Sequence, residues 1–123
     1  MYAIMKKILI VISLIAVLIS CTVLSDPRIV ITKKSDGRDA SDKYFWKVEL
    51  KNEGEKPAYF VILILTAWKN GKEIERKEWA YGDIFPNQIA EETIILNKVG
   101  FETPDSTTFK ITYTSTDLSN PVK

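Results

Sequence analysis

Hydrophobic and polar positions alternate along most of the chain with a period near two residues, rather than the roughly 3.6 of an amphipathic helix. β-branched and aromatic residues are abundant in these segments, and turn-forming residues separate them. The pattern therefore predicts β-strands throughout the chain after its N-terminal segment. The expected strands cover residues 28–34, 44–52, 58–69, 72–80, 89–96 and 107–115.

Two of these strands have one apolar face and one polar face, as half-buried strands do. The apolar residues are Trp46, Val48 and Leu50 in the first and Phe109, Ile111 and Tyr113 in the second. The segment 58–69 is apolar on both sides, which predicts a central strand. We expect loops to cover its second face, and the alternative is that this face is left for a partner.

Asn70 and Gly71 form the turn pair that tolerates a positive φ at both central positions of a type I′ hairpin. Pairing across this turn sets Ala67 against Ile74, Leu65 against Arg76, and Ile64 against Lys77. The strand 72–80 is then largely charged, which is typical of a protected edge strand. Trp79 needs a β-bulge nearby to face inward.

The connections 34–42 and 97–106 are longer and polar, and the others are short turns. Short strands with such regular punctuation favour an all-β, two-sheet antiparallel sandwich of about six to seven strands.

The N-terminal segment has the layout of a signal peptide. Lys6 and Lys7 precede an apolar run over residues 8–19, and the small residue Ser20 follows it. As a helix this run reaches about 18 Å, which is short of the roughly 30 Å of a bilayer core.

Residues 18–21, "LISC", resemble the lipobox of prokaryotic lipoproteins, with Leu18, Ile19 and Ser20 before Cys21. The resemblance implies cleavage before Cys21 and attachment of a diacylglyceryl group to its sulfur, which would hold the protein on the cell membrane or the outer membrane. The alternative is an uncleaved signal anchor helix that extends to Leu24. Both interpretations place the rest of the chain outside the cytoplasm.

The expected organisation is a signal peptide over residues 1–20, a short tether over 21–27, one β-sandwich domain over 28–117 and a C-terminal tail over 118–123. A chain of 123 residues leaves room for one core after removal of the leader.

Residues 48–96, "VELKNEGEKPAYFVILILTAWKNGKEIERKEWAYGDIFPNQIAEETIIL", resemble the immunoglobulin-like modules of exported prokaryotic proteins, especially the FxLYD type and more loosely the CARDB type. The shared layout is a strand ending in Asn-x-Gly, a small residue after a proline, an apolar strand, a glycine hairpin and a proline-centred turn. The resemblance implies an immunoglobulin-like β-sandwich and supports no particular activity.

Charge and composition exclude several classes of function. Two of the 17 basic residues lie in the leader, which leaves 15 basic against 16 acidic residues from Cys21 onward. This balance gives no electrostatic basis for nucleic-acid binding. Histidine is absent and cysteine occurs once, which removes internal disulfides, histidine-assisted nucleophiles and zinc sites of the usual kind. We expect no cofactor and no enzyme activity.

Two groups of residues are candidates for a binding site. Asp36, Asp39 and Asp42 could offer carboxylates to calcium, and the alternative is a solvated turn. Trp68, Trp79 and Tyr81 could form an amphipathic contact surface for sugars or protein, and the alternative is that they pack in the core.

The sequence as a whole predicts a lipid-anchored, extracytoplasmic β-sandwich that binds or scaffolds an envelope protein or glycan. The alternatives are a small-ligand carrier, an inhibitor of an exported enzyme, a purely structural lipoprotein and an envelope protein held by a single signal-anchor helix.

Overall fold

Six strands form where the alternating pattern predicts them, in a computed structural model that describes residues 23–116. The strands are β1 (Ile29–Arg38), β2 (Tyr44–Asn52), β3 (Ala58–Lys69), β4 (Lys72–Ile84), β5 (Ile89–Leu96) and β6 (Ser106–Thr114). The expected leader, with Leu18, Ile19, Ser20 and Cys21, lies outside the described residues, as do residues 117–123. No helix of a length and hydropathy that could cross a membrane occurs in residues 23–116.

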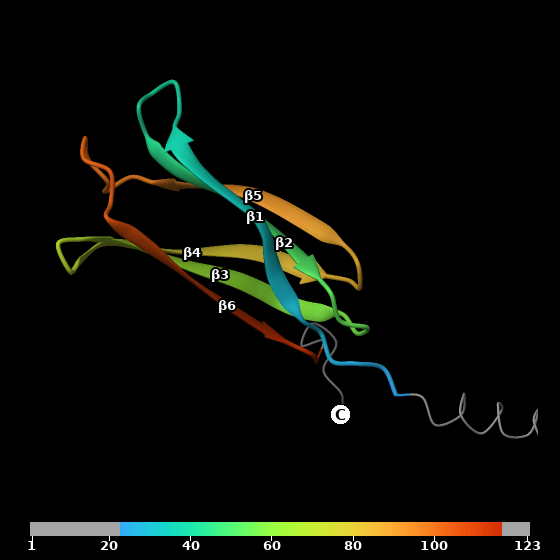
Figure 1. Cartoon of the computed structure of the whole chain (residues 1–123). Helices are drawn as coiled ribbons and strands as arrows, with labels where there is room; N and C mark the ends of the chain where they lie inside the picture. Colours follow the sequence, from blue (N-terminus) through green and yellow to red (C-terminus); the bar gives the residue numbers. More distant parts are fainter. Residues whose placement is uncertain (1–22, 117–123) are drawn as a thin grey trace, which may run out of the picture.

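The strands make two antiparallel three-stranded sheets, in the orders β1-β2-β5 and β4-β3-β6, which form the two layers of Figure 1. Inward side chains of both layers meet in one core. This explains why apolar and polar residues alternate along the strands. The fully buried apolar side chains include Val48 and Leu50 from β2, Leu63 and Leu65 from β3, and Ile94 from β5.

β3 is the central strand of its sheet and β4 is an edge, as the sequence predicts. The expectation that loops cover the second face of β3 is not met within residues 23–116. Ile62 and Ile64 on that face are only half-buried, and the nearby Phe60 is 46% exposed.

The β3–β4 hairpin turns at Asn70 and Gly71, whose φ angles are 52° and 75°. The predicted turn is therefore confirmed, but the predicted register is wrong by one residue. Ala67 lies opposite Glu75, Leu65 opposite Lys77 and Ile64 opposite Glu78.

A β-bulge between Ala67 and Trp68 causes this shift, since Ile74 is the extra residue of β4. Beyond the bulge Trp79 pairs with Leu63 and packs against the core. The predicted need for a bulge near Trp79 is thus confirmed.

β1 extends to Arg38 and β4 to Ile84, so both are longer than predicted. The first half of the expected loop 34–42 continues the pairing of β1 with β2, with Asp36 opposite Trp46. Local polarity suggested a loop there, but an antiparallel hairpin continues until its turn, whatever the polarity of its outward side chains.

Asn52 fixes the end of the sandwich at which the chain enters. Its amide nitrogen donates to the carbonyl oxygens of Lys56 and Ile84, both at 2.9 Å, and its Oδ1 accepts from the backbone N–H groups of Arg28 and Gly54. A Cβ at Gly54 would lie 2.1 Å from the carbonyl oxygen of Asp26, so this position requires glycine. The Asn-x-Gly turn therefore has a structural role.

Candidate binding surface

The outer face of the β4-β3-β6 sheet carries an apolar row along its central strand. Ile62, Ile64 and Trp68 of β3 point away from the core, because they alternate with the buried Leu63, Leu65 and Ala67. We call these three residues the outer row. All three remain half-buried rather than covered.

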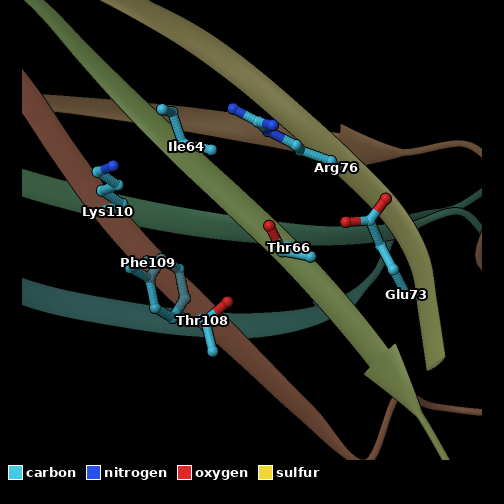
Figure 2. A pocket seen from close by; sticks show the side chains of 7 residues that line it. All are labelled: Ile64, Thr66, Glu73, Arg76, Thr108, Phe109 and Lys110. Carbon is cyan, nitrogen blue, oxygen red and sulfur yellow. The ribbon is translucent and has the colours of Figure 1, made fainter. Parts of the chain in front are cut away.

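A shallow hollow of about 290 Å³ lies beside this row, and Figure 2 shows the side chains around it. We call it the outer groove, and its lining is Ile64 and Thr66 of β3, Glu73 and Arg76 of β4, and Thr108, Phe109 and Lys110 of β6. All three strands of the sheet thus contribute to it.

Cross-strand pairing places these side chains in two rows. Thr66 lies between Arg76 and Thr108, and Ile64 lies between Glu78 and Lys110. Arg76 and Lys110 extend on either side of Ile64 (Figure 2). The guanidinium of Arg76 also donates to Oε1 of Glu78 at 3.2 Å.

The groove therefore has an apolar and hydroxyl floor and a rim with charges of both signs. Trp68 contacts one of the lining residues, since its indole N–H donates to Oγ1 of Thr108 at 3.1 Å. Such a surface provides apolar contact and polar orientation, which are the two requirements of a binding site.

The three aromatic residues expected to form one contact surface do not lie together. Trp68 is on the outer face near the hairpin, whereas Trp79 and Tyr81 pack against the core. The hydroxyl of Tyr81 donates to the carbonyl oxygen of Val48 at 2.8 Å and so joins the two sheets. Burial, together with the nearby carboxylates of Glu92 and Glu91, raises the pKa of Tyr81 well above its usual value.

The carboxylates of two of the three candidate calcium ligands are engaged in local hydrogen bonds. Asp36 accepts from the hydroxyl of Tyr44 at 2.6 Å, and Asp39 accepts from the backbone N–H groups of Ser41 and Lys43. Asp42 occupies the turn with a φ of 60°. No group of three or more carboxylate, cysteine or histidine side chains with the geometry of a metal site occurs within residues 23–116.

A second hollow, also of about 290 Å³, lies between the β1–β2 turn and the β5–β6 loop. Arg38 spans it, because its guanidinium donates to the carbonyl oxygens of Asp42, Gly100 and Phe101. The guanidinium of Arg38 thus joins the β1–β2 turn to the β5–β6 loop through these hydrogen bonds.

Sequence reasoning missed the polar residues of the outer groove, namely Thr66, Glu73, Arg76, Thr108 and Lys110. The doubly apolar segment 58–69 was the available signal, because it left one apolar face to be explained. The register of each strand pair decides which β4 and β6 side chains flank that face. The bulge at Ile74 shifts the register of β4 against β3 by one residue.

Comparisons with protein-family models, with characterised proteins and with solved structures found no match to this chain.

Proposed function

We propose that this protein is a lipid-anchored binding or scaffolding module of the cell envelope, held by Cys21 and contacting its partner through the outer row and the outer groove. The observation that carries the proposal is the uncovered outer face of β3. A central strand that is apolar on both sides normally lies between two covering layers, and here one layer is missing within residues 23–116. Uncovered apolar surface with a polar rim is typical of contact sites.

The shape of the surface supports a macromolecular partner over an enclosed small ligand. The space between the two sheets is filled by core side chains such as Leu50, Leu63 and Ile94. The outer groove is open and shallow, and its floor is one strand wide. A carrier needs a pocket that encloses most of its ligand, so contact with an envelope protein or a glycan fits this surface better.

The order of the strands supports the immunoglobulin-like assignment. In immunoglobulin domains strands A, B and E share one sheet while C and F belong to the other. Here β1, β2 and β5 form one sheet, and β3 and β6 belong to the other with β4 beside β3. The chain thus alternates between sheets in the same order.

The contacts of residues 23–25 fit a short membrane tether. Val23 and Leu24 are exposed, and within residues 23–116 the hydrogen bonds nearest to the start of the described chain join Ser25 and Glu55. The three residues between Cys21 and Ser25 span roughly 10 Å when extended. A lipidated Cys21 would therefore hold the Asn52 end of the sandwich close to the bilayer.

Site-specific photocrosslinking in intact cells tests the proposed contact surface. A photoreactive phenylalanine analogue replaces Ile64 in the outer groove, and the same analogue replaces Lys47 as the control, because Lys47 is exposed on the opposite sheet. We expect one reproducible crosslinked product from position 64 and none from position 47. Identical products from both positions, or none from position 64, would contradict the proposal.

A further inference from the structure

β6 has one strand neighbour among residues 23–116. The order β4-β3-β6 places β6 at an edge of its sheet (Figure 1), so the backbone N–H and C=O groups on its second side have no strand partner within residues 23–116. An unpaired strand edge of this kind is a template for the addition of another strand.

The other three edge strands carry features that discourage such pairing, and β6 carries almost none. β4 has bulges at two places and seven charged residues, and β1 has a bulge near Thr32. β5 carries Glu91 and Glu92. β6 instead pairs in unbroken register from Ser106 to Thr112, has a single charge at Lys110, and consists mostly of threonine and other strand-forming residues.

The inward side chains of β6 are also less buried than the inward side chains of β3 beside them. Phe109 and Ile111 are half-buried, whereas Leu65 and Leu63, which lie opposite them on β3, are fully buried. Phe109 packs edge-to-face on Trp46, with ring centroids 5.0 Å apart. A strand added beside β6 would cover this apolar surface.

Two cations flank the edge. The ammonium of Lys34 on β1 lies 4.7 Å from the ring centre of Phe109, and Lys110 projects from the opposite face of β6. Neither takes part in the ion pairs formed among residues 23–116. β6 itself contains no acidic residue.

We propose that the free edge of β6 binds an extended acidic peptide segment of a partner protein by antiparallel strand addition. Apolar side chains on its inward face cover Phe109 and Ile111, with one carboxylate on that face beside Lys34. The carboxylates on its outward face lie beside Lys110. A second copy of this chain fits less well, because two β6 strands would bring together two lysines and no carboxylate. The edge is distinct from the outer groove, although Lys110 borders both, and its use does not depend on lipidation.

The probe is an acetylated ten-residue peptide that alternates valine with glutamate and has one further glutamate in place of a central valine, so that both faces of the strand carry a carboxylate. The matched control has lysine at every glutamate position. Each is added to the full chain in nonionic detergent, with tryptophan fluorescence as the binding signal and amide hydrogen exchange as the map. We expect saturable binding of the acidic peptide only. Exchange should slow at the β6 amides that point away from β3.

Charge reversal then tests the recognition. Lys34→Glu and Lys110→Glu should each weaken binding of the acidic peptide about fivefold, and the double variant should prefer the basic peptide. Lys72→Glu is the matched control on the exposed hairpin and should change nothing. Arg76→Ala, on the far side of the outer groove, should also leave the affinity unchanged.

Several results would overturn this proposal. One is equal binding of the acidic and basic peptides, or no saturable binding of either. Another is a loss on Arg76→Ala as large as that on Lys34→Glu, which would place the peptide in the outer groove. A third is slow exchange at the outward β6 amides of the free chain, which would mean that residues 117–123 or a second copy already cover the edge. None of these results bears on the contact of the outer row with its partner, which the crosslinking at position 64 tests separately.

Discussion

At the scale of single residues, the sequence indicates where turns occur but not which side chains hold them. Asn52 and Gly54 were recognisable as an Asn-x-Gly turn, and the turn is present. The two backbone carbonyl groups that Asn52 reaches belong to Lys56 and Ile84, and the second is 32 residues away. Such a partner depends on the packing of β4 against the β2–β3 turn, which no local pattern encodes.

Replacement of Asn52 by alanine should strongly destabilise the domain. The variant leaves buried N–H and C=O groups without partners, and we expect a loss of about 2–4 kcal/mol in the free energy of unfolding. Urea denaturation measures it, with the exposed Asn97→Ala as the control that should change little. A loss below about 0.5 kcal/mol for Asn52→Ala would show that these hydrogen bonds do not hold the turns.

Tyr44 makes the stability of the domain sensitive to alkaline pH. Burial and the hydrogen bond to Asp36 raise the pKa of Tyr44 from 10.0 to about 12. A group whose pKa is raised on folding stabilises the folded state below its unfolded pKa, and this contribution is lost as the pH rises through the folded pKa.

The difference in unfolding free energy between the natural protein and Tyr44→Phe should therefore be largest below pH 10, at about 1–2 kcal/mol, and should shrink between pH 10 and about 12. Urea denaturation at a series of pH values measures the difference. A value that stays constant over that range would mean that Tyr44 ionises equally in both states.

At the scale of elements, all six predicted strands begin within one residue of their observed start, and β2, β3 and β5 match at both ends, because period-two alternation and turn residues are local signals. The need for a bulge in β4 was predictable from Trp79, but its position, and with it the register of β4, was not. Neither Glu73 nor Ile74 signals a bulge.

Gly71→Val should weaken the β3–β4 hairpin, because valine is strained at the φ of 75° found there. We expect a loss of about 1–3 kcal/mol in unfolding free energy. Gly100→Val is the matched control, since a Cβ at Gly100 meets no atom within 4 Å and its φ is not in the left-handed region. Equal losses for the two variants would contradict the hairpin argument.

At the scale of the whole molecule, composition and patterning predicted an all-β domain of two antiparallel sheets, and the structure confirms it. The outer groove was not predictable in the same way. It joins residues of β3, β4 and β6, and its lining depends on which strand lies at each side of β3. The neighbours of β3 are determined by the packing of the whole domain, whereas the apolar second face of β3 could be predicted from the sequence alone.

The proposed anchor also bears on the proposed binding surface. Lipidation of Cys21 would bring the Asn52 end of the sandwich near the bilayer, and β3 would then run away from the membrane and present the outer row along its length. A lipid-held module of this kind raises the local concentration of its surface beside other envelope components.

Lipidation at Cys21 is the central claim, and intact-mass spectrometry of the protein extracted from its native membrane tests it most directly. The account predicts a mature chain that begins at Cys21 and carries the added mass of a diacylglyceryl group, with Cys21→Ala retaining the uncleaved leader and no acyl mass. A native protein that still begins with the leader and carries no acyl mass would contradict it.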